Sequence, residues 1–168
     1  MTDSTPAAGG LLGVGDMAPP FRLRNQYGET ISLEDFRGEK HVVVVFYPFA
    51  FSGICTGEFR EIRDHLEDFE DDDVQVLGIS CDPMESIRAW ADAEGYFFPL
   101  LSDFWPHGET ARAYGVFWEE TGFALRGTFL VDRDGVVRWV LLNGPGEPRD
   151  FAGYRAALAA LRSTTAPV

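Results

Sequence analysis

The sequence is poor in cysteine, of which it holds only two, and it lacks any long apolar run. Two cysteines in a chain of this length do not make a disulfide framework, and without a C-x-x-C pair the chain lacks the thiols of a dithiol exchange enzyme or a structural zinc site. The longest aliphatic run, Val42 to Val45, is far shorter than the roughly 20 residues that span a bilayer. No basic residue precedes Arg22, so no secretory signal is visible. We therefore expect a cytoplasmic protein that does not bind membranes.

Basic residues are also scarce. The 14 lysines and arginines face 27 acidic residues, which gives a net charge of -13. Nucleic-acid binding usually needs a basic surface, so we expect no nucleic-acid partner. The 168 residues are enough for one domain with its own core. We expect a flexible lead-in over residues 1–12, one domain over 13–162, and a flexible tail over 163–168.

Strand and helix patterns alternate along the domain. His41 to Tyr47 and Val74 to Ser80 are apolar on both faces, as are the buried strands of parallel sheets. In chain order the pattern predicts a hairpin (21–31), a helical turn (32–36), a strand (41–47), a helix (53–69), a strand (74–80), a helix (83–93), a short apolar segment (98–101), a helix (109–114), a second hairpin (128–142) and a closing helix (148–161). This order predicts an α/β fold with a mixed central sheet flanked by helices, which fits a thioredoxin-like core.

Cys55 follows the first of these buried strands after a short loop. Ser52 is a good N-cap, so Cys55 falls in the first turn of the next helix. The free backbone N–H groups and the positive dipole end of that turn favour the thiolate over the thiol. Because the thiolate is the nucleophile, the position predicts a reactive cysteine. A small buried cysteine that packs under the loop fits the same placement equally well.

A Cys–His hydrolase is another function that the residues allow. It needs a histidine within hydrogen-bond reach of Cys55. His65 lies nearly three turns farther along the same helix, and His41 opens a buried strand, so neither suits the role. His107 lies in a Trp-Pro-His-Gly loop, and its place relative to Cys55 is open.

The string P-x-x-x-S-x-x-C over residues 48–55 resembles the peroxiredoxin active-site motif P-x-x-x-[T/S]-x-x-C. Several other stretches agree with that family in order and spacing: GDMAPPFRL (15–23), Glu58, LGIS (77–80), FPLLSD (98–103), AYGV (113–116) and RGTFLVD (126–132). The resemblance covers roughly residues 13–161. Within the family, residues 50–55 and 100–108 are most similar to the one-cysteine type known as alkyl hydroperoxide reductase E.

The resemblance implies a thiol peroxidase that reduces hydrogen peroxide and organic hydroperoxides, extending to peroxynitrite, through a Cys55 sulfenic acid. In that mechanism Cys55 attacks the peroxide, while Arg126 and Ser52 donate hydrogen bonds to it. Pro48 shields the pocket from water, and Glu58 holds Arg126 in place by ion pairing. The resemblance implies no metal and no other cofactor.

The expected partners are a hydroperoxide and a thiol reductant, which is thioredoxin, a glutaredoxin-like protein or a low-molecular-weight thiol. The family forms homodimers or larger homo-oligomers, and the pair Phe104-Trp105 would suit such an interface. Phe49 and Phe51, beside Cys55, would favour organic hydroperoxides, but they fit a core or an interface as well.

Cys81 leaves a second mechanism open. It follows the second buried strand, at the same sheet edge as Cys55, from where it could resolve the sulfenic acid as a disulfide. The one-cysteine type has no resolving cysteine there. The same Cys55 chemistry also suits a peroxide sensor or a holdase chaperone, and a peroxide-consumption assay would separate these functions.

Overall fold

The computed structural model describes residues 10–144 and 146–165, so the first nine residues of the expected lead-in (1–12) and the last three of the expected tail (163–168) lie outside this part of the chain. Residues near both ends of the described part belong to the folded domain. The Leu12 N–H donates to the carbonyl of Tyr114 at 3.3 Å. The last helix continues to Thr165, so the tail expected from residue 163 begins inside a helix.

A seven-stranded mixed sheet forms the centre of the molecule, in the order β2-β1-β5-β4-β3-β8-β9. Strand β4 pairs with β3 and β5 in parallel, and the other pairs are antiparallel. The strands are β1 (Arg22–Asn25), β2 (Thr30–Ser32), β3 (His41–Phe46), β4 (Val74–Ser80), β5 (Leu100–Ser102), β8 (Arg126–Val131) and β9 (Val137–Asn143). The expected mixed sheet is therefore confirmed.

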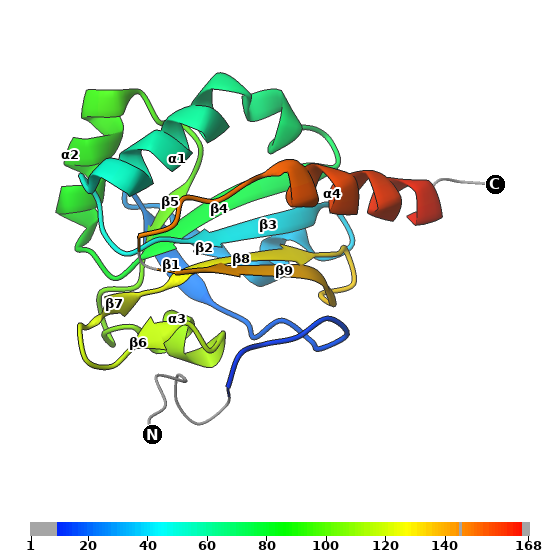
Figure 1. Cartoon of the computed structure of the whole chain (residues 1–168), viewed down its shortest axis with the longest axis horizontal. Coiled ribbons are helices and arrows are strands. Elements are labelled where there is room, and N and C mark those ends of the chain that lie inside the picture. Colours follow the sequence, from blue (N-terminus) through cyan, green and yellow to red (C-terminus); the bar gives the residue numbers. More distant parts are fainter. Residues whose placement is uncertain (1–9, 145, 166–168) are drawn as a thin grey trace.

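Helices cover both faces of this sheet. In Figure 1, α1, α2 and α4 lie on one side of the sheet, and α3 lies on the other with a small hairpin, β6–β7. The helices are η1 (Leu33–Phe36), α1 (Gly53–Asp64), η2 (Leu66–Asp68), α2 (Met84–Glu94), α3 (Glu109–Ala113) and α4 (Ala152–Thr165). This arrangement confirms the α/β prediction.

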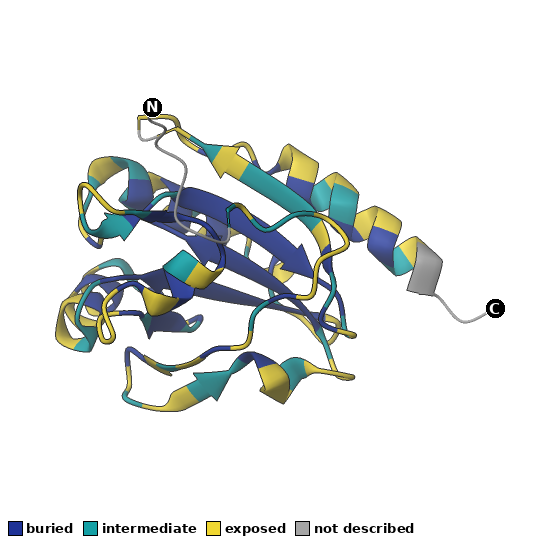
Figure 2. Cartoon of the chain, turned by 90° about the horizontal axis from the view of Figure 1, so that it is seen from below, coloured by how far each residue is buried: buried dark blue, intermediate teal, exposed yellow. Residues whose placement is uncertain are grey.

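Strand parity divides the core into two layers, because successive side chains of a strand point to opposite faces. Val43, Val45 and Tyr47 pack under α1, α2 and α4, whereas Val42 and Val44 pack on the opposite face. Both layers are closed to solvent, and Figure 2 shows the central strands of the sheet as the most buried part of the chain. The first layer ends in an aromatic cluster formed by Tyr47, Phe59, Trp90, Tyr96 and Phe98.

The helix bounds differ from the expected ones at three places. Helix α1 ends at Asp64, because His65 has φ -125° and ψ 40°, outside the helical region, and only a short 3-10 turn follows. Helix α2 runs from Met84 to Glu94, one residue later at each end than expected, with Pro83 as its N-cap residue. Helix α4 begins at Ala152, whose N–H is accepted by the Asp150 side chain, so the segment from residue 148 to 151 stays outside the helix.

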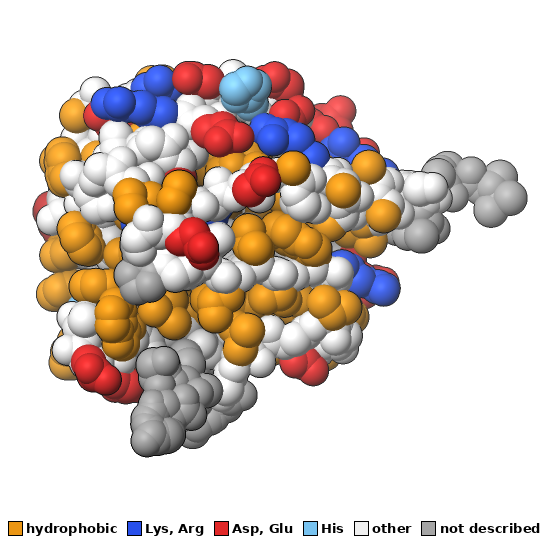
Figure 3. Space-filling model, in the orientation of Figure 1, with side chains coloured by type: hydrophobic (Ala, Val, Ile, Leu, Met, Phe, Trp, Pro, Cys, Tyr) orange, Lys and Arg blue, Asp and Glu red, His pale blue; other side chains and the backbone are white. Residues whose placement is uncertain are grey.

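The hairpin of β6 (Phe117–Trp118) and β7 (Phe123–Ala124) was not expected from the sequence. Its strands are too short to show an alternating pattern. Elsewhere on the surface, charged side chains of both signs lie along the rim of the molecule above α1 (Figure 3). Surface ion pairs also form, for example between Arg60 and Glu94 at 2.7 Å. Among the described residues, no helix has the length and apolarity needed to cross a bilayer.

Candidate active site

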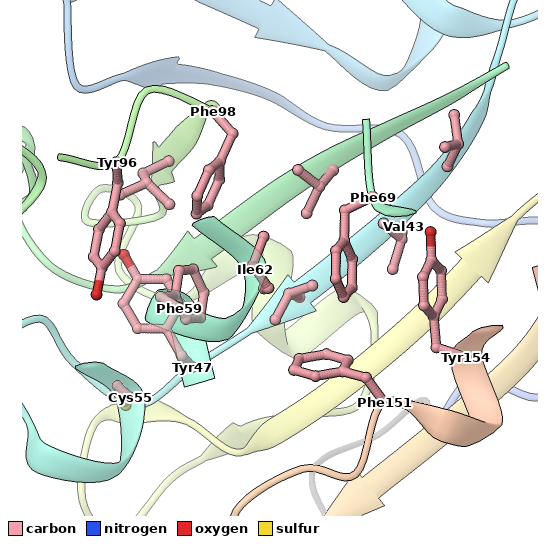
Figure 4. Packing of buried hydrophobic residues seen from close by; sticks show 14 of the residues in the cluster. Val43, Tyr47, Cys55, Phe59, Ile62, Phe69, Tyr96, Phe98, Phe151 and Tyr154 are labelled. Carbon is pink, nitrogen blue, oxygen red and sulfur yellow. The ribbon is translucent and has the colours of Figure 1, made fainter. Parts of the chain in front are cut away.

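Cys55 lies in the first turn of α1, as the sequence predicted. Ser52 is the N-cap residue, and its Oγ accepts a hydrogen bond from the Cys55 N–H at 3.3 Å. Cys55 is therefore the third helical residue, where backbone N–H groups point out of the helix end. Its side chain is fully buried, at one end of the aromatic cluster (Figure 4). Pro48, which is also buried, opens the loop that leads to it.

The loop before Cys55 is held by a contact with the end of β4. The Ala50 N–H donates to Asp82 Oδ2 at 2.8 Å, and the Ser80 hydroxyl donates to the same oxygen at 2.7 Å. Phe51 has φ 69°, in the left-handed region that side chains other than glycine rarely adopt. Such strain persists only where the surroundings fix the backbone, and it concentrates at functional loops.

Arg126 links Cys55 to Glu58 inside the protein. Arg126 Nη2 donates to Cys55 Sγ at 3.4 Å, and Nη1 donates to Glu58 Oε1 at 2.5 Å. Both side chains of this ion pair are buried, with exposed fractions of 3% and 2%. The antiparallel pairing explains the contact: β8 begins at Arg126 beside the place where β3 ends, and β3 leads directly into the Cys55 loop. The geometry thus brings together three residues that the sequence analysis had chosen.

A second buried arginine, Arg149, was missed. Its backbone N–H and Nε donate to Glu58 Oε2 at 2.8 and 3.1 Å. Its remaining nitrogens donate to Thr128 Oγ1 at 2.9 Å and to the carbonyls of Gly127 and Phe46. Burial lowers the pKa of Arg149, and the charge of Glu58 opposes that shift. Glu58 is therefore fixed from two sides, which in turn fixes Arg126.

Arg149 gives little sign of this role in the sequence. It lies in an irregular segment next to Pro148 and Asp150, which reads as a polar helix start. An arginine two residues before the apolar Phe151 is the only available signal, and it is weak because arginines are common at such borders. Arg149 is a partner of Glu58 only because the fold brings together two residues that are 91 positions apart in the chain.

The charges of the four ionisable groups in this cluster sum to zero when Cys55 is a thiolate. Glu58 and the thiolate then carry two negative charges, and Arg126 and Arg149 carry two positive ones. A buried charge is costly unless it is paired, and a negative charge on the Cys55 sulfur would pair with the second arginine. The Arg126 guanidinium lies where negative charge would spread during attack on an oxygen atom. The arrangement suits a nucleophilic thiolate.

Cys81 lies at the carboxyl end of β4, the sheet edge that the sequence predicted, but on the other face of the sheet. It shares a face with Leu77 and Ile79, in the layer opposite to the one that holds Cys55. Burial, with the nearby charges of Asp103 and Asp82, raises the pKa of Cys81 to about 12. Both cysteines are free thiols.

The histidines lie elsewhere. His41 is buried at the start of β3, and His65 ends α1 with Nδ1 3.2 Å from the Glu61 carbonyl. His107 Nε2 lies 2.7 Å from the carbonyl of Gly122. Among the described residues no hydrogen bond joins any of these rings to Cys55, so the geometry offers no support for a Cys–His hydrolase. Within residues 10–144 and 146–165, no group of three histidine, cysteine or acidic side chains could hold a metal ion.

Exposed aromatic side chains lie on the loop itself and on a separate segment farther along the chain. Phe49 and Phe51 are both exposed, and the Phe49 ring packs against that of Phe123 from the β6–β7 hairpin at a centroid distance of 5.5 Å. Phe104 and Trp105 are also exposed, at 45% and 80%. Neither Phe49 nor Phe51 is therefore a core residue within one chain, one of the alternatives that the sequence had left open.

Comparisons with known proteins point to one family. The model of the AhpC/TSA family matches residues 14–140. The chain is 51% identical over 151 residues to "Alkyl hydroperoxide reductase E" of Mycobacterium tuberculosis, covering 90% of this chain and 99% of that protein. It is 30% identical over 164 residues to "2-Cys peroxiredoxin BAS1, chloroplastic" of Hordeum vulgare, covering 92% and 77%. Among solved structures, "Mycobacterium tuberculosis AhpC" superposes with a TM-score of 0.80 at 28% identity, covering 94% of this chain and 97% of that one.

Proposed function

The chain belongs to the AhpC/TSA family of peroxiredoxins and is a thiol peroxidase, and from this premise we propose that it works by a one-cysteine mechanism with Cys55 as the attacking thiolate. The observation that carries the proposal is the contact of Arg126 with both Cys55 Sγ and Glu58. This contact holds the positively charged guanidinium of Arg126 next to the sulfur, in a site that is closed to solvent.

In the first step the Cys55 thiolate attacks the terminal oxygen of the hydroperoxide. The S–O bond forms as the O–O bond breaks, and the departing alkoxide or hydroxide takes a proton to become an alcohol or water. The sulfur is oxidised to a sulfenic acid. Negative charge moves from sulfur to the leaving oxygen, so donors that line this path stabilise the transition state. Arg126 Nη2 donates to the sulfur at 3.4 Å, and in this proposal the hydroxyl hydrogen of Ser52, whose oxygen accepts from the Cys55 N–H, adds a second donor to the peroxide.

In the second step an external thiol attacks the sulfenic sulfur, which releases water and leaves a mixed disulfide. A second thiol then restores Cys55. We assign no part in this step to Cys81, because it packs on the opposite face of the sheet and its raised pKa keeps it a neutral thiol. A disulfide within one chain would require both cysteines to leave their layers.

The remaining expectations are part of the proposal. The substrates are hydrogen peroxide, organic hydroperoxides and peroxynitrite, and the reductant is thioredoxin, a glutaredoxin-like protein or a low-molecular-weight thiol in the cytoplasm. The exposed Phe104 and Trp105 favour a homodimer built on that loop. A change from dimer to monomer in sedimentation on Trp105→Ser would support this interface, and an unchanged dimer would exclude it.

Peroxide consumption with a panel of reductants tests the function. The Cys55→Ser variant should lose peroxide reduction while its circular dichroism stays that of the wild type, since serine fills nearly the same space. Turnover at the wild-type rate in this variant would refute the assignment of Cys55. A wild-type protein that is oxidised once but not recycled by any reductant would indicate a peroxide sensor.

A further inference from the structure

The side chain of Asp82 joins the loop before Cys55 to the neighbouring strand. Its Oδ2 accepts a hydrogen bond from the Ala50 N–H at 2.8 Å and another from the Ser80 hydroxyl at 2.7 Å. Ala50 lies in the middle of the loop that connects β3 to α1, and it is buried, so an N–H without an acceptor would be costly there. The Asp82 carboxylate supplies that acceptor from a position 32 residues farther along the chain.

Asp82 is itself held by the sheet. Strands β3 and β4 are parallel, and Phe46 pairs with Ile79, so both strands end at the same edge. Asp82 follows β4 at this edge, and its carbonyl oxygen accepts a hydrogen bond from the Ser102 hydroxyl of β5 at 2.6 Å. The backbone of Asp82 is therefore fixed, and its carboxylate is an acceptor at a defined place beside the loop.

The loop needs such a contact because its backbone is strained. Phe51, the residue after Ala50, has φ 69°, a region in which the Cβ atom of an ordinary side chain is crowded. Without a contact that holds it, the loop would relax toward ordinary backbone angles and the residues on either side of Phe51 would move. These residues include Pro48 and Ser52, which in the proposed peroxidase mechanism lie around the peroxide.

We propose that Asp82 is a positioning residue for the peroxide step, which holds residues 48–52 in the strained conformation that places the peroxide for attack by Cys55. We call its hydrogen bond with the Ala50 N–H the loop anchor. The role rests on the proposed peroxidase function. Arg126 reaches the sulfur from β8, so its contact with Cys55 does not pass through the loop. The loop anchor therefore determines where the peroxide lies and leaves the partner of the sulfur in place.

Loss of the loop anchor should slow the peroxide step by about tenfold or more. A hydrogen bond to a charged acceptor changes an equilibrium by about 10- to 10²-fold. Without it, the strain at Phe51 favours relaxed loop conformations, and the rate falls with the population of the placed conformation. A misplacement of about 1 Å around reacting atoms can by itself cost about 10²-fold in rate.

Two substitutions separate the acceptor from its charge. Asp82→Ala removes the acceptor, and Asp82→Asn keeps one side-chain oxygen that can accept the Ala50 N–H in a weaker, neutral hydrogen bond. The matched control is Asp71→Ala. Asp71 Oδ1 accepts hydrogen bonds from the N–H groups of Asp73 and Val74 at 2.7 and 3.0 Å, at the opposite end of β4, so its loss disturbs the same strand away from the loop.

The experiment compares two reactions of Cys55 in the reduced protein. One is the stopped-flow rate constant with hydrogen peroxide, and the other is the rate of alkylation by iodoacetamide, measured by mass spectrometry on the peptide that contains Cys55. Alkylation needs a nucleophilic sulfur but none of the contacts that place a peroxide. We expect Asp82→Ala to lower the peroxide constant at least about tenfold without lowering the alkylation rate, and Asp82→Asn to stay within about fivefold of the wild type. Asp71→Ala should match the wild type in both reactions.

Relief of the strain provides an independent measurement. Glycine adopts positive φ without steric cost, so in Phe51→Gly the loop no longer has to be held against its own backbone. Asp82→Ala should therefore lower the peroxide constant less in the Phe51→Gly background than in the wild-type background, and the ratio of the two effects measures the coupling. Circular dichroism of every variant should match that of the wild type, since Asp82 is only half-buried.

The outcomes separate this role from the function on which it rests. Wild-type protein that consumed no peroxide would refute the peroxidase and the loop anchor together. Wild-type turnover with an unchanged peroxide constant in Asp82→Ala would refute the loop anchor alone. A fall of both constants in the same proportion would also refute it, because Cys55 itself would then be less reactive. Equal losses in Asp82→Ala and Asp82→Asn would contradict the role of the acceptor, and equal effects of Asp82→Ala in both backgrounds would contradict the link to Phe51.

Discussion

Removal of the Arg126 guanidinium is the most direct test of the cluster. In Arg126→Ala the Cys55 sulfur loses the donor at 3.4 Å, and Glu58 loses the partner at 2.5 Å. The buried charges then no longer balance, since Glu58 and a thiolate would face Arg149 alone. The variant should therefore lose both the positive charge beside the sulfur and stabilisation of the transition state.

The magnitude follows from burial. Breaking a buried ion pair by removing one partner commonly costs about 3–5 kcal/mol, because the other charge stays behind unpaired. We expect that range here, since both side chains are almost completely enclosed. Loss of one donor at the transition state commonly slows a reaction on the order of 10²–10³-fold. Arg126→Lys should recover only part of the rate, because a point charge cannot reach sulfur and carboxylate together as the planar fork does.

The assay is the stopped-flow rate constant with hydrogen peroxide as a function of pH, with unfolding in urea on the same samples. Higher pH should restore only part of the rate of Arg126→Ala, because it supplies thiolate but no donor. Arg60→Ala is the control, since Arg60 lies on the exposed side of α1, where it pairs with Glu94 at the end of α2, and its rate should match the wild type. Full recovery at high pH would mean that Arg126 only promotes ionisation, and an unchanged rate at every pH would refute its role.

Three other predictions concern Cys81, Arg149 and Asp103. Cys81→Ser should keep most activity with a monothiol, and a Cys55–Cys81 disulfide in peptide maps after one equivalent of peroxide would contradict the one-cysteine mechanism. Arg149→Met strips Glu58 of its second partner, so the free energy of unfolding should fall by about 3–5 kcal/mol, and an unchanged urea midpoint would contradict this. Burial raises the pKa of Asp103 from 3.8 to about 6, so between these values the native state holds the extra proton. Wild-type stability should then gain up to about 1.4 kcal/mol per pH unit from Asp103 as the pH falls through this range, relative to Asp103→Asn; parallel pH profiles of the two proteins would exclude it.

Interactions between near neighbours in the chain were predictable from the sequence. Ser52 and Cys55 are three residues apart, so the cap and the first-turn position of the cysteine follow from one local rule. The buried strands were found because an apolar run on both faces is visible within a few residues. Glu58 and Arg126 came from a family resemblance, since nothing local to either residue indicates the other.

Tertiary structure alone decided the rest of the site. Arg126 reaches Cys55 because β8 runs antiparallel to β3 and starts where β3 ends, an adjacency that no local pattern specifies. Arg149 meets Glu58 across 91 residues, from a segment without regular structure. Cys81 lies at the sheet edge that the sequence predicted, but on the face opposite to Cys55. Side chains alternate between the two faces along β4, and Cys55 belongs to the layer on the α1 side of the sheet. Local interactions are fixed by the order of residues, whereas these contacts depend on which strands pair and which face each side chain takes.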